Sequence, residues 1–150
     1  MPDWAVDRCR ENVERHGWNA TGVVTVNEVA YVYTTGLTTH LGSPELVVAG
    51  LDPHTGHDLL KAAVAKAEAG AALEPGVLYE GIAAGFVVRF RDVFGPVCRL
   101  SFAVTSAFYG RPVAFRQLTW PDVSGRFPGE PGCSEWVASA QDIGGVGQHG

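Results

Sequence analysis

The sequence is short of cysteine and of basic residues. Its three cysteines, Cys9, Cys98 and Cys133, lie far apart with no CxxC pair, which argues against a disulfide framework and against a thiolate metal site. Eleven lysines and arginines stand against sixteen acidic residues, the net charge is −5, and the basic residues are not clustered. Because a phosphate backbone is bound by a concentrated basic surface, nucleic acid is not an expected partner.

Long hydrophobic runs and common catalytic signatures are also missing. No uncharged apolar stretch reaches the roughly 20 residues that a membrane helix requires. Residues 1–18 mix both charges, unlike a signal or transit peptide, so we expect a cytoplasmic protein that does not bind membranes. The chain has no GxSxG, Walker or HExxH motif. The common hydrolase and nucleotidase signatures are therefore absent.

The chain does contain enough apolar residues for a core of its own. It has 150 residues, of which 46% are hydrophobic and 18% charged, a composition typical of globular proteins and far from that of disordered chains. A chain of this length buries about two thirds of its unfolded surface. One domain is therefore expected, and it needs neither a metal nor a disulfide to fold.

Hydrophobic periodicity predicts an α+β fold. Helices are expected over 3–16, 55–70 and 96–110, and strands over 23–26, 29–34, 45–51, 86–91 and 112–120. The order predicts a single domain with a mainly antiparallel sheet of about five strands and helices packed on it. Residues 121–150 contain three prolines and seven glycines, so we expect an irregular tail that lies across the domain or is partly disordered.

An unusual polar interruption separates two of the predicted strands. Residues 33–45, YTTGLTTHLGSPE, place hydroxyls, a glycine and a histidine between apolar runs. Loops at the edge of a rigid sheet commonly bind ligands, so Tyr33, Thr35 and Thr38 are candidate ligand-binding residues. His40 and Glu45 are candidate catalytic residues, a proton acceptor and its orienting partner, if one pocket brings them together. The structural alternative is a strand end followed by a turn.

A second polar loop follows the last predicted strand. Within WPDVSGRFPGEPG, residues 120–132, Asp122 and Arg126 lie across a turn that glycine permits. We expect the two to form an internal clasp that holds the loop. An Arg126 left free would bind a carboxylate or phosphate, so Asp122 and Arg126 are also candidate ligand-binding residues. If this loop folds over residues 33–45, the two segments enclose a single cleft.

Two further histidines, His54 and His57, can be interpreted as part of a helix cap or as metal ligands, and the cap is favoured. His54 and His57 lie with Asp52 and Asp58 around a predicted helix start, where Thr55 is expected to cap and a carboxylate suits the helix dipole. Imidazole and carboxylate groups are also ligands for zinc or iron. The spacing favours the cap, and no metal site is predicted.

Several motifs together resemble a known family. ENVERHGW, VAYVYTTGLTTHLGSPELVVAGL and QLTWPDVSGRFPGEPG occur in this order, and the chain resembles the bacterial family called domain of unknown function 4262 over nearly its whole length. Gly129 stands where the resemblance leads us to expect an aromatic residue after Arg-Phe-Pro. The resemblance implies a single intact domain, and it implies no activity or cofactor.

The sequence leaves two functions in competition. The leading prediction is a domain that binds a small ligand or a partner protein in a cleft between residues 33–45 and 120–130. The alternative is a small acid/base or hydrolytic enzyme that uses His40 and Glu45, with Tyr33 or Arg126 as positioning groups. A third reading is an interaction module, for which a homodimer would be one arrangement. The sequence specifies no cofactor.

Overall fold

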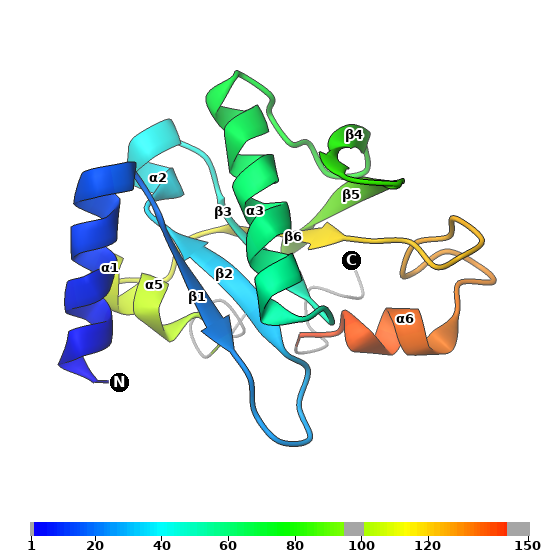
Figure 1. The fold of residues 1–150 in the computed structure, drawn as a ribbon, viewed down its shortest axis with the longest axis horizontal. Coiled ribbons are helices and arrows are strands. Elements are labelled where there is room, and N and C mark those ends of the chain that lie inside the picture. Colours follow the sequence, from blue (N-terminus) through cyan, green and yellow to red (C-terminus); the bar gives the residue numbers. More distant parts are fainter. Residues whose placement is uncertain (1, 95–100, 144–150) are drawn as a thin grey trace.

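The computed structural model describes residues 2–94 and 101–143, and its centre is a six-stranded sheet in the order β1-β2-β3-β6-β5-β4 (Figure 1). The strands are β1 (Asn19–Val23), β2 (Tyr31–Thr35), β3 (Glu45–Ala49), β4 (Leu78–Ala83), β5 (Phe86–Val93) and β6 (Phe115–Thr119). The helices are α1 (Asp3–His16), α2 (Leu37–Leu41), α3 (Pro53–Glu68), α5 (Ala103–Tyr109) and α6 (Glu135–Ala140).

The sheet carries apolar clusters on both faces. Alternation along each strand sends successive side chains to opposite faces. Val48, Leu118 and Phe90 face α3, which crosses the front of the sheet in Figure 1. Val47 and Phe115 face the opposite way and pack with α1 and α5 residues. Because both faces are covered, all five residues of β3 are buried.

Strand direction decides which loops meet. β2 and β3 are antiparallel, whereas β3 and β6 are parallel, with Glu45 opposite Phe115 and Val48 opposite Leu118. The end of β2 therefore lies beside the starts of β3 and β6. The loop that follows β6 lies at the other end of these strands. The expected cleft between residues 33–45 and 120–130 is wrong for this reason.

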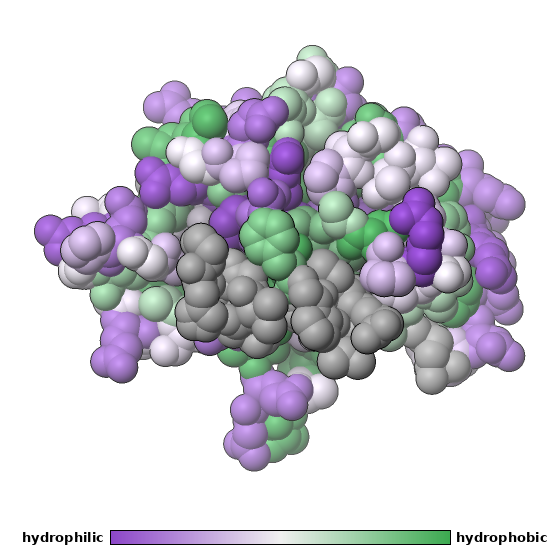
Figure 2. Space-filling model, turned by 180° about the vertical axis from the view of Figure 1, so that it is seen from behind, coloured by the Kyte–Doolittle hydropathy of each residue, from purple (hydrophilic) through white to green (hydrophobic). Residues whose placement is uncertain are grey.

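The predicted α+β fold with a mostly antiparallel sheet is confirmed, with corrections in detail. The strand expected over 23–26 is wrong, because β1 covers Asn19–Val23, Val23 pairs with Tyr31 of the antiparallel β2, and the connection between them spans 24–30. Figure 2 shows this connection projecting from the body of the molecule, where Val24 and Val26 are exposed. Strand β4 was not predicted. The helix expected over 96–110 is seen as α5, while its first residues lie outside the described part of the chain.

The C-terminal segment is irregular until a short helix. Turns occupy much of 121–132, and α6 follows with Gln141 as its C-cap. The buried amide of Gln141 accepts from the Trp120 backbone N–H and donates to the Trp120 carbonyl, at 3.0 and 2.8 Å. This exchange ties the end of the described chain to the end of β6. Residues 144–150 lie outside the described part. Among the helices in the described ranges, none has the length and apolar character needed to cross a membrane.

Candidate functional site

The polar interruption surrounds a buried carboxylate. Glu45 is 0% exposed. Its oxygens accept the hydroxyl of Thr34 at 2.7 Å and the backbone N–H groups of Gly36, Leu37 and Thr38 at 3.1 Å each. Tyr109 donates a further hydroxyl at 2.7 Å. These bonds replace the water that the charge loses on burial, and they cap the first turn of α2.

Tyr33 and Thr35 are interior residues that join β2 to α5. The Tyr33 hydroxyl accepts the backbone N–H of Val104 at 3.0 Å. The hydroxyls of Thr35 and Thr105 are 2.7 Å apart, and Thr105 also donates to the Thr34 carbonyl at 2.8 Å. Both predicted ligand-binding side chains are at most 1% exposed. The positions that were predicted to face a ligand therefore fasten the helix to the sheet.

Burial of Tyr33 predicts a loss of stability at alkaline pH. Desolvation raises the pKa of Tyr33 to about 12, although the Val104 N–H acts to lower it. In the unfolded chain the phenol has a pKa of about 10. The stabilisation is complete below pH 10 and is lost as the pH rises toward 12, because the unfolded state gives up the proton first. Denaturation measured across this range should show unfolding free energy falling less steeply in Tyr33→Phe.

The phenolate absorbance provides an independent check on Tyr33. One tyrosine of the four should ionise near pH 12 in the native protein, and Tyr33→Phe should remove that step. Burial also raises the pKa values of Tyr31 and Tyr109, so only the last step identifies Tyr33. A native protein whose last tyrosine ionises near pH 10 would contradict the assignment.

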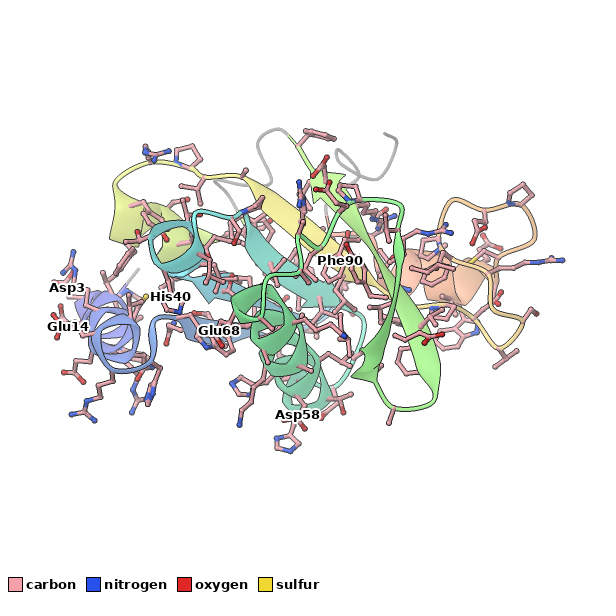
Figure 3. The ribbon with its side chains drawn as sticks, turned by 90° about the horizontal axis from the view of Figure 1, so that it is seen from above. Asp3, Glu14, His40, Asp58, Glu68 and Phe90 are labelled. Carbon is pink, nitrogen blue, oxygen red and sulfur yellow. The ribbon has the colours of Figure 1, made fainter. Side chains whose placement is uncertain are left out.

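His40 lies outside this network. Its Nε2 is 3.0 Å from Glu68 Oε2 on α3, and Figure 3 shows the two side chains pointing toward one another. The ring covers Gly17, where an added Cβ would lie only 2.9 Å from it. Glu45 is enclosed by other partners. The structure therefore does not bring the predicted catalytic pair His40 and Glu45 together.

Asp122 and Arg126 form their turn through the backbone. Asp122 accepts the N–H groups of Ser124, Arg126 and Ser134 at 2.9, 3.0 and 2.8 Å. These hydrogen bonds lower the pKa of Asp122, and the bond from the Arg126 backbone N–H has the largest effect. The Arg126 side chain is exposed and lies against Gly132. The predicted clasp is therefore made by the Asp122 carboxylate and backbone N–H groups, and it lies far from residues 33–45.

The cap of α3 differs from the expected one. Asp52, not Thr55, is the N-cap, and its carboxylate accepts the Thr55 backbone N–H at 3.2 Å. His54 and Asp58 form an exposed pair at 3.7 Å. Within residues 2–94 and 101–143, no three histidine, cysteine or acidic side chains are grouped to hold a metal ion.

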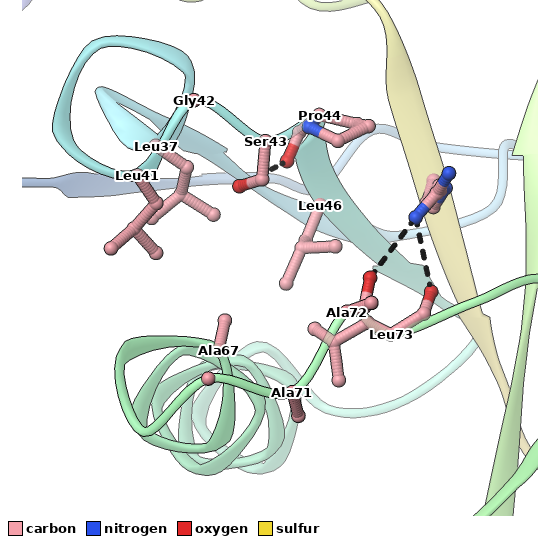
Figure 4. Close-up of a pocket in the computed structure, with 12 residues that line it drawn as sticks. Leu37, Leu41, Gly42, Ser43, Pro44, Leu46, Ala67, Ala71, Ala72 and Leu73 are labelled. Atoms are coloured by element: carbon pink, nitrogen blue, oxygen red, sulfur yellow. Dashed lines mark hydrogen bonds between the residues drawn. The ribbon is translucent and has the colours of Figure 1, made fainter.

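A pocket of about 390 Å³ opens beside α2 (Figure 4). One wall comes from the predicted interruption and the other from the end of α3 and the chain that follows it. Figure 4 shows the side chains of Leu41 and Ala67 on opposite walls. The lining residues are Leu37, Leu41, Gly42, Ser43, Pro44, Leu46, Ala67, Gly70, Ala71, Ala72, Leu73 and Arg116. Thr38 supports this wall, because its hydroxyl donates to the Ser43 carbonyl at 2.9 Å.

Arg116 is the charged group in the pocket lining. Its Nε donates to Asp92 at 3.2 Å, and its Nη1 donates to the carbonyls of Ala72 and Leu73 at 3.1 and 3.3 Å. In the described chain the second amino group, Nη2, has no hydrogen-bond partner. The guanidinium is thus held in place by Nε and Nη1, and the N–H donors of Nη2 are available to a ligand.

One wall of this pocket was predicted from the sequence as part of a binding site. Leu37, Leu41 and Ser43 belong to the segment that was singled out, but Arg116 and the 67–73 wall were missed. A signal for Arg116 was present in the sequence. It lies two residues before Leu118 in a strand, so both side chains lie on the same, core-facing side. An arginine at such a position needs partners or a hollow beside it.

Comparison with known proteins supports the family resemblance. No curated protein and no solved structure matches the chain. One family model does match, over residues 12–134, and its description is Domain of unknown function (DUF4262). That range includes the α2 segment, α3 and the whole pocket lining. The chain belongs to the DUF4262 family.

Proposed function

We propose that this chain is a binding domain that holds a small apolar acid in the pocket between α2 and the end of α3. The observation that carries the proposal is a hollow with leucine and alanine walls and one positioned guanidinium. Ligand pockets commonly combine about 300 to 1,000 Å³ of apolar space with a few fixed polar groups. The pocket has both features.

The lining selects the chemistry of the ligand. Leu37, Leu41, Leu46 and Leu73 favour a hydrocarbon body, because apolar surface gains free energy when it leaves water. The Nη2 donors of Arg116 suit a carboxylate at one end of that body. Asp92 neutralises part of the guanidinium charge, so hydrocarbon burial supplies most of the affinity and the arginine supplies orientation.

The acid/base alternative has weaker support. Its two groups have separate partners, Glu68 for His40 and the α2 backbone for Glu45. A carboxylate that already accepts five donors has little capacity left to orient an imidazole. We therefore retain ligand binding, and we replace the 120–130 wall of the original hypothesis with residues 67–73.

Filling the pocket should weaken the binding of an apolar acid. Octanoate titrated into the wild-type protein should bind, and Ala67→Phe should weaken it by about tenfold or more, because the new ring occupies the space of the alkyl chain. Calorimetry measures both affinities. Ala69→Phe is the matched control, since Ala69 is an exposed residue of the same helix end that does not line the pocket.

The role of the guanidinium is tested in the same titration. Octanol should bind less tightly than octanoate to the wild-type protein, and Arg116→Leu should remove that difference while thermal melting confirms a folded variant. Equal octanoate affinity in the wild type, Ala67→Phe and Ala69→Phe would refute the pocket. Failure of octanoate to bind at millimolar concentration would refute the proposed ligand class.

A further inference from the structure

A second hollow lies along α3, and Glu68 is one of its lining residues. It has a volume of about 500 Å³ and opens between the end of α1, β1 and α3. Its lining residues are Asn12, His16, Trp18, Asn19, Ala20, His57, Lys61, Val64, Ala65 and Glu68. We call it the α1–α3 groove. It shares no lining residue with the pocket described above.

The α1–α3 groove combines an aromatic floor with basic groups. The rings of Trp18 and His57 have centroids 6.1 Å apart and planes 20° apart. Lys61 and His16 are exposed along the same hollow. Glu68 also lines it, and its Oε2 lies 3.0 Å from His40 Nε2. Lys61 therefore provides a positive charge close to a flat apolar surface.

The floor of the groove is fixed before any ligand arrives. Gly17 ends α1 with φ +88°, and its N–H donates to the Val13 carbonyl at 2.8 Å. This left-handed turn directs the chain into β1 and sets Trp18 beside α3. Asn19 is 8% exposed, and its side-chain oxygen accepts from Asn12 at 2.7 Å. A preformed floor loses little conformational entropy on binding.

We propose that the α1–α3 groove is a second binding site, for a planar aromatic ring that carries a negatively charged group. The ligand ring packs against the stacked rings of Trp18 and His57, which give it an aromatic surface. The carboxylate or phosphate of the ligand pairs with the Lys61 ammonium, with His16 and His57 as nearby imidazole donors. This chemistry differs from that of the leucine-lined pocket, which has no aromatic lining residue.

Two anionic probes test the α1–α3 groove by NMR. Indole-3-acetate carries a carboxylate and adenosine monophosphate carries a phosphate, and indole-3-ethanol and adenosine are their uncharged counterparts. At least one anionic probe should shift the amide signals of Asn12, Trp18, His57 and Lys61. It should bind about tenfold more tightly than its uncharged counterpart. Which probe binds more tightly identifies the preferred anion.

A charge reversal provides the decisive variant. Lys61→Glu should weaken the anionic probe by about tenfold or more. Lys66→Glu reverses a lysine on the same helix that does not line the groove, and should leave the affinity unchanged. Ala67→Phe should also leave it unchanged, so the two sites are tested separately. The proposal fails if neither anionic probe binds, if the uncharged probes bind equally well, or if Lys61→Glu has no effect.

Discussion

Replacing Glu45 by alanine should lower the free energy of unfolding by about 4 kcal/mol, because buried donors are left without an acceptor. Three backbone N–H groups and the hydroxyls of Thr34 and Tyr109 meet on this carboxylate. Alanine offers none of them a partner, and the site is closed to water. The connection between β2 and β3 depends on this one side chain.

Urea denaturation measures the effect at Glu45, with Glu68→Ala as its control. Glu68 is also a glutamate with a close partner, but its side chain is 44% exposed and pairs with His40 at the surface. Surface pairs are screened by water and salt, so its loss should cost less than about 1 kcal/mol. If Glu45→Ala and Glu68→Ala unfold at the same urea concentration, the carboxylate does not hold the connection as described.

Gly36→Ala should destabilise the protein by about 3 kcal/mol, because strain and a steric clash act together. Gly36 has φ +112°, and an added Cβ would lie 2.7 Å from the Gly17 carbonyl oxygen and 3.0 Å from the Trp18 Cα. Both neighbours are backbone atoms and cannot rotate away. The close approach of the two segments therefore requires glycine at this position.

Gly42→Ala isolates the steric part of the Gly36 effect. Gly42 ends α2 with φ +68°, yet no atom lies within 4 Å of the Cβ it would gain. Its replacement carries only the backbone cost of a left-handed residue, about 1 kcal/mol. Thermal melting of both variants compares them directly. Equal melting temperatures would show that Gly17 and Gly36 are not in close contact.

Local signals were sufficient for the long elements. The apolar positions of α1 and α3 recur at helical spacing, Gly17 ends α1 in the left-handed region, and the valine-rich run of β3 is typical of a strand buried on both faces. These features depend on neighbours in the sequence. They could be read without knowledge of the sheet order.

Features that depend on distant residues could not be read in this way. LTTHL has few good helix formers, and α2 exists because Glu45 accepts its first N–H groups. The parallel pairing of β3 with β6 joins segments about 70 residues apart, and that pairing separates residues 33–45 from the 120–130 loop. A glutamate at a strand start looks the same in sequence whether it is catalytic or buried as an acceptor.

The polar interruption therefore has a structural explanation and a functional proposal. Glu45 and its donors fold residues 36–44 into a short helix and a turn. That same segment forms one wall of the leucine-lined pocket, with Leu37, Leu41 and Ser43 as lining residues. The hydroxyls stabilise the wall, and the leucines between them provide the surface that we propose meets a ligand.

The most direct test of the proposed binding function is intermolecular NOE spectroscopy with octanoate and isotope-labelled protein. We predict contacts from the alkyl chain to the methyl groups of Leu41, Leu46 and Leu73, which line the pocket. The carboxylate end should perturb the Arg116 guanidinium signals. NOEs confined to other residues, or none at all at saturating octanoate, would contradict the account.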